Sequence, residues 1–170
     1  MVRSAALLAA LALFAAGCGD TETSPSENVS VFTAQLSPAN EVPLVTNAES
    51  SGRGTVTILL TVERDSAGAI TSGTADFQVN MTNFPTSTVL TMSHIHVGAA
   101  GVAGGIRVNT GQAPGDVSLA TGSASYMKKG VFVSGADAQA IIDNPAGYYF
   151  NVHSQTNGPG VARGQLVKTQ

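Results

Sequence analysis

Residues 55–62 read Thr-Val-Thr-Ile-Leu-Leu-Thr-Val, and this stretch indicates the fold class. Apolar side chains at Val56, Ile58, Leu60 and Val62 alternate with a second set that is mostly threonine. A period of two is the period of a β-strand, so one face of the segment packs in a core and the other faces away from it. The stretch therefore predicts a half-buried strand of an antiparallel sheet.

Several other segments have the same strand character. Residues 75–81 repeat the alternation, and residues 65–68 (Asp-Ser-Ala-Gly) between the two segments are typical of a hairpin loop. Strands are expected at residues 29–36, 53–62, 75–81, 106–109, 117–125, 131–133, 148–153 and 164–168. Short strands separated by Gly/Pro turns predict an all-β fold, an antiparallel β-sandwich or immunoglobulin-like barrel of about 7–9 strands.

One short helix is expected near residues 135–143. Its sequence contains good helix formers, and Ser134 or Gly135 can cap its first turn. Asn144-Pro145 should end it, because the residue before a proline avoids the α region.

Composition excludes several classes of protein. The chain has 170 residues, which favours one domain. Only 11% of the residues are charged and the net charge is −3, so a nucleic-acid partner, which requires a basic face, is not expected. A single cysteine cannot form an internal disulfide, and the fold must be stabilised by its core.

The first residues resemble an export signal. Residues 5–16 form an unbroken apolar run after Arg3, long enough for a signal peptide but short of the roughly 20 residues that cross a bilayer. Ala15-Ala16-Gly17-Cys18 resembles the bacterial lipobox, in which the cysteine is lipidated, with palmitate among its acyl chains, and becomes the mature N-terminus. The alternative is an ordinary secretory signal with an incidental cysteine.

These features predict three segments. Residues 1–17 are expected to be a lipoprotein signal peptide, residues 18–28 a flexible polar tether, and residues 29–170 the β-domain. A lipid on Cys18 would make the protein a membrane-anchored component of the bacterial cell envelope, because acyl chains supply membrane affinity without a spanning helix.

All three histidines fall in two strand motifs. His94 and His96 are two residues apart and share one face of a strand, while His153 shares a face with Asn151. In both motifs the apolar neighbours occupy the opposite face. Three imidazoles could form an open site for Zn²⁺ or Cu²⁺ completed by water. Alternatively, they hydrogen-bond to backbone carbonyls or to Asn151 and hold loops in place.

Two further polar residues stand out among apolar neighbours. Arg163 begins the final predicted strand, and Glu41 lies in Asn40-Glu41-Val42-Pro43. They are expected to form an ion pair, or else Arg163 is a solvated residue at a strand edge. Residues 98–105 are rich in glycine but lack the following helix of a nucleotide loop, so they predict a turn between strands.

Four segments together resemble the CHRD domain family, first named in chordin. They are residues 36–43 (Leu-Ser-Pro-Ala-Asn-Glu-Val-Pro), 94–98 (His-Ile-His-Val-Gly), 147–153 (Gly-Tyr-Tyr-Phe-Asn-Val-His) and 160–166 (Gly-Val-Ala-Arg-Gly-Gln-Leu). They occur in the family's order and span nearly all of residues 29–168. The resemblance implies a β-sandwich or immunoglobulin-like barrel and brings no established enzymatic activity. His-x-His on a β-barrel is also similar to Cu/Zn superoxide dismutase, but this chain has no histidine left to complete that ligand set.

Two functions remain open from the sequence. The first is a non-enzymatic, lipid-anchored envelope module that binds an unidentified protein or ligand or has a structural role. The second is a metal-binding or redox protein that uses His94, His96 and His153, with Cu or Zn as the candidate cofactor. A hydrolase has no support, because the chain has no Gly-x-Ser-x-Gly and no prominent acid pair.

Overall fold

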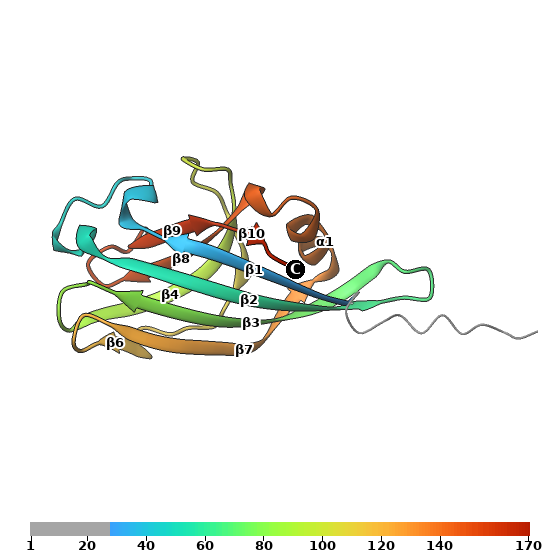
Figure 1. Ribbon diagram of the computed structural model, residues 1–170, viewed down its shortest axis with the longest axis horizontal. Coiled ribbons are helices and arrows are strands. Elements are labelled where there is room, and N and C mark those ends of the chain that lie inside the picture. Colours follow the sequence, from blue (N-terminus) through green and yellow to red (C-terminus); the bar gives the residue numbers. More distant parts are fainter. Residues whose placement is uncertain (1–27) are drawn as a thin grey trace, which may run out of the picture.

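The computed structural model describes residues 28–170, which form ten strands in two antiparallel sheets, one α-helix and three short 3-10 helices (Figure 1). The predicted signal peptide, Cys18 and the predicted tether up to residue 27 lie outside the described residues.

The first sheet contains the segment that indicates the fold class. Its strand order is β10-β1-β2-β3-β7. The bounds are β1 (Val29–Leu36), β2 (Arg53–Arg64), β3 (Ile70–Thr82), β7 (Ala124–Ser134) and β10 (Val167–Lys168). Ile58 of β2 lies opposite Phe77 of β3 and Val56 lies opposite Val79, and all four side chains are buried. The predicted alternation therefore gives this sheet one core face.

The second sheet has the order β5-β4-β8-β9, and β6 pairs with β4. The bounds are β4 (Thr88–Val97), β5 (Ile106–Asn109), β6 (Val117–Leu119), β8 (Tyr148–Ser154) and β9 (Ala162–Gln165). Ile95, Phe150 and Val152 point into the core. Phe150 stacks on Phe77 of the first sheet with ring centroids 5.6 Å apart, so these two rings connect the layers at the centre of the core.

The two sheets approach each other most closely where β1 passes β9. Ser37 forms an isolated bridge with Arg163, and its N–H donates to the Arg163 carbonyl at 3.1 Å. Gly164 permits this approach, because a Cβ at that position would lie 2.1 Å from the backbone oxygen of Gln35. The backbone contact fixes Arg163 beside the segment that follows β1.

The predicted antiparallel sandwich is confirmed, and two details differ. The sheets remain separate layers, so the barrel alternative is wrong. There are ten strands instead of about 7–9, and two predicted strands are each divided; the end of the first joins residues 131–133 in β7. Residues 117–125 contain a turn with Gly122 at φ 79°, and residues 164–168 are interrupted at Leu166, whose side chain is buried in the core.

The predicted helix is confirmed as α1 (Gly135–Asp143). Ser134 caps it by accepting a hydrogen bond from the Asp137 N–H, and Ile141 packs into the core. A 3-10 helix, η4 (Pro145–Gly147), follows and leads into β8. Among residues 28–170, no helix has the length and apolar character needed to cross a membrane.

Candidate functional site

The polar residues singled out in the sequence meet on the outer face of the second sheet. His94 and His96 project from β4, Asn151 and His153 from β8, and Arg163 from β9. The strand register places them in rows: His94 lies opposite Asn151, which lies opposite Arg163 on its other side. Period-two alternation carries these side chains away from the core, as predicted.

This face is nevertheless closed to solvent. The exposed fractions are 2% for His94, 8% for His96 and 6% for His153. Loops cover the face, including residues 98–105 after β4 and residues 155–161 after β8, whose carbonyls bond the imidazoles. The alternation in the sequence identifies the face on which the imidazoles lie, but it contains no signal that loops would bury them.

Two of the imidazoles are held by backbone carbonyls. His96 Nδ1 lies 2.9 Å from the Gly104 oxygen, and His153 Nδ1 lies 2.8 Å from the Gly158 oxygen. A carbonyl oxygen only accepts, so each Nδ1 carries the proton and donates it. The Nε2 atom of each ring therefore keeps its lone pair free for another partner.

The other ring nitrogens converge. His94 Nδ1 donates a hydrogen bond to His153 Nε2 at 3.2 Å, and one ligand nitrogen from each of the three rings lies within 4.8 Å of the others. Two nitrogens bound at about 2.0–2.1 Å to one tetrahedral metal are roughly 3.3 Å apart. The His94–His153 separation is thus close to what a shared metal ion requires.

One nitrogen of the cluster lacks any partner. His96 Nε2 is buried and forms no hydrogen bond. A buried polar atom without a partner costs free energy, so its presence requires an explanation such as a bound ion. The donor set fits a transition metal, because neutral imidazole suits Zn and Cu and the Nδ1 hydrogen bonds orient two of the rings.

The rings are also uncharged near neutral pH. Burial, together with the charges of His153 and His96, lowers the pKa of His94 to about 4. Burial likewise lowers the pKa of His96 and the pKa of His153. Protons therefore compete weakly with a metal ion for these nitrogens.

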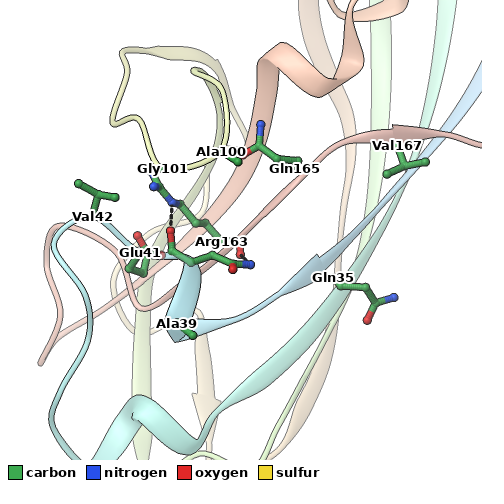
Figure 2. Close-up of a pocket in the computed structure, with 10 residues that line it drawn as sticks. Gln35, Ala39, Glu41, Val42, Ala100, Gly101, Arg163, Gln165 and Val167 are labelled. Carbon is green, nitrogen blue, oxygen red and sulfur yellow. Dashed lines mark hydrogen bonds between the residues drawn. The ribbon is translucent and has the colours of Figure 1, made fainter.

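Arg163 and Glu41 lie beside the imidazoles but do not form the predicted ion pair. Arg163, drawn in Figure 2, donates from Nε to the Asn40 carbonyl. It also donates from Nη1 to the Val102 carbonyl at 3.2 Å. The sole ion pair within residues 28–170 joins Lys128 and Asp116. Arg163 is 2% exposed, so the alternative of a solvated arginine is wrong as well.

Glu41 is a buried carboxyl group near that arginine. Burial raises the pKa of Glu41 to about 7, although the charge of Arg163 and the Asn151 amide act in the opposite direction. Glu41 Oε1, Asn151 Oδ1 and Arg163 Nη2 are buried without partners. Glu41 and Arg163 also line a cleft of about 480 Å³, bordered by Val42, Ala100 and Gly101 (Figure 2).

Tyr149 is a member of the site to which the sequence analysis gave no role. It lies opposite His96 in the strand register, and its hydroxyl accepts a hydrogen bond from the Gly104 N–H at 3.2 Å. Its spacing of two from Asn151 and four from His153 could have placed it on the same face. Gly104 and Gly158 had no sequence signal, because they contribute backbone oxygens.

The fold and the site together define a class: a two-layer β-sandwich with a buried, histidine-rich polar cluster on the outer face of one sheet. Within that class the chain belongs to the CHRD domain family, whose sequence profile matches residues 32–166. The match covers all four motifs that carried the resemblance. No curated protein and no solved structure matched the chain.

Proposed function

We propose that this CHRD protein is an exported, lipid-anchored binding protein without enzymatic activity, and that its ligand is a transition metal ion held by His94, His96 and His153. The observation that carries the proposal is the convergence, within 4.8 Å, of one nitrogen from each of three buried imidazoles, together with a buried His96 Nε2 that has no partner.

The arrangement of the rings supports metal binding over a purely structural role. The Nδ1 bonds to Gly104 and Gly158 would suffice to hold the two loops. These two bonds do not explain why the other ring nitrogens face one another in a buried space. Three uncharged rings place more lone pairs than protons in that space, so hydrogen bonds among the rings cannot satisfy every nitrogen. A metal ion would satisfy all three nitrogens together.

The envelope location is supported by the N-terminal sequence alone. The apolar run at residues 5–16 and the lipobox-like residues 15–18 favour export and lipidation at Cys18. Replacement of Cys18 by serine is expected to release the protein from the membrane fraction of expressing bacteria. Continued membrane attachment of Cys18→Ser would overturn lipidation at that residue.

Metal titration tests the binding role. The full chain carrying Cys18→Ser, kept in mild detergent, is titrated with Zn²⁺ and with Cu²⁺, since the serine removes the sole thiol as a competing ligand. Binding at micromolar concentration or below is expected, with its loss in His94→Ala/His96→Ala. Circular dichroism establishes that the double variant keeps its β-sheet signal.

Two outcomes would overturn the metal role. One is that the folded protein binds neither ion. The other is binding that survives in the double variant, which would place the metal elsewhere. Either result would leave the imidazoles with the loop-holding role seen in their carbonyl hydrogen bonds.

A further inference from the structure

Met92 lies next to the imidazole cluster in the strand register. It precedes His94 by two residues on β4, and it is directly opposite His153 on β8. The register from Met92 to Val97 is continuous, so Met92, His94 and His96 share the outer face of the sheet. Directly opposite residues have Cβ atoms about 4.5–5.5 Å apart, which brings a methionine thioether within reach of its neighbour's ring.

The Met92 side chain is not packed in the core. It is 38% exposed at the margin of a cluster whose three histidines are buried. Methionine has an unbranched, adaptable side chain, so a rotation about its side-chain bonds can redirect the sulfur. The geometry therefore places a soft sulfur donor beside three nitrogen donors.

Building on the proposed function, we propose that the site is selective for Cu(I), with His94, His96 and His153 as nitrogen ligands and the Met92 thioether as a fourth ligand. Thioether sulfur selects Cu(I) among the metals that bind imidazole, while Zn²⁺ has no comparable preference for it.

The charges around the site favour the same ion. No carboxylate belongs to the ligand group among the described residues. Arg163 adds a buried positive charge nearby, over the Tyr149 ring that stacks on His96. Placing an ion in a low-dielectric site costs free energy that rises steeply with its charge, so a monovalent ion is better tolerated than a divalent one.

The experiment compares two methionine variants. The full chain with Cys18→Ser is titrated without oxygen against a chromophoric Cu(I) chelator, and separately against a Zn²⁺ chelator. Met92→Leu is expected to weaken Cu(I) binding by at least about tenfold and to change Zn²⁺ binding by less than about threefold. Met127→Leu is the matched control, because Met127 is 52% exposed on β7 of the other sheet.

The outcomes separate this inference from the proposed function. Unchanged Cu(I) affinity in Met92→Leu would overturn the role of the thioether, and Zn²⁺ affinity equal to or above that for Cu(I) would overturn the selectivity. Both results would leave a metal site at the histidines. Failure of every ion to bind, or binding that His94→Ala/His96→Ala does not remove, would instead reject the metal site itself.

Discussion

The imidazole of His96 stacks on the ring of Tyr149, with centroids 5.0 Å apart and planes 8° from parallel. The guanidinium of Arg163 lies over the same tyrosine ring, 4.6 Å from its centroid. Tyr149 is itself buried, so its ring is a fixed support for both groups. The orientation of the His96 ring therefore depends on a residue outside the three-histidine cluster.

Replacing this ring tests the support. Tyr149→Leu keeps an apolar side chain but removes the stack, and we expect metal affinity to fall by about tenfold because groups that orient a ligand contribute about that much. Tyr149→Phe keeps the ring and loses the bond from the Gly104 N–H, so its effect on affinity should be smaller. Competition titration measures the metal affinity of both variants. An equal loss of affinity in the two variants would contradict the role of the stack.

Neighbouring glycines provide a second test. A Cβ at Gly104 would lie 1.6 Å from the Val97 oxygen, while a Cβ at Gly105 would meet nothing within 4 Å. Gly104→Ala must therefore displace the loop whose carbonyl bonds His96, and we expect it to lower both metal affinity and thermal stability. Gly105→Ala should leave both unchanged. Similar behaviour of the two variants would show that the loop does not position His96.

The metal-free protein should lose stability as the pH falls. In the unfolded chain His94 has the ordinary pKa of 6.5, whereas burial lowers its pKa to about 4 in the folded protein. Protons then bind preferentially to the unfolded chain below pH 6.5, and the stabilisation is lost as the pH falls toward 4. Between pH 6.5 and pH 4, the unfolding free energy of the wild type should fall by on the order of 1–3 kcal/mol more than that of His94→Gln, as measured by urea unfolding. An unchanged pH profile would contradict the burial argument.

Glu41 should contribute with the opposite sign. Its pKa is raised from 4.5 to about 7, so the folded protein retains the proton longer than the unfolded chain. The stabilisation from this group is present below pH 4.5 and is lost as the pH rises toward 7. Relative to Glu41→Gln, the wild type should therefore lose about 1–3 kcal/mol of unfolding free energy across this interval. Parallel profiles of the two proteins would refute the raised pKa.

Arg163 and Glu41 should be coupled through charge although they form no ion pair. The charge of Arg163 lowers the pKa of Glu41, so Arg163→Met should raise that pKa further. The pKa of Glu41 is measured directly by following its carboxyl carbon chemical shift by NMR across a pH titration. Because Arg163 also bonds the carbonyls of Asn40 and Val102, the same variant should lose about 1.5–3 kcal/mol of stability. A Glu41 pKa that does not move would show that the two groups are screened from each other.

The fold was largely predictable because it depends on local periodicity. Val56 and Ile58 on one strand, and Phe77 and Val79 on the next, alternate in the sequence and face the core in the structure. The helix cap at Ser134 was predictable for the same reason, since its bond to the Asp137 N–H spans three residues. Strand count was less predictable, because the break at Leu166 depends on tertiary packing.

The site was predictable only in part. Alternation places His94, His96 and His153 on the outer face, and the structure brings them together. Their burial depends on backbone carbonyls of Gly104 and Gly158, and a carbonyl is present at every residue and carries no sequence signal. The expected bond between Glu41 and Arg163 is absent because the guanidinium points its Nε and Nη1 at the main-chain oxygens of Asn40 and Val102 instead.

Strand β1 links the two ends of the molecule. It begins at Val29 and ends at Leu36 (Figure 1), and the 3-10 helix Pro38–Asn40 that follows brings the Asn40 carbonyl to Arg163. Eight extended residues span roughly 25 Å at about 3.3 Å per residue. A lipid attached ahead of Val29 would thus join the domain about one strand length away from the segment that bonds Arg163.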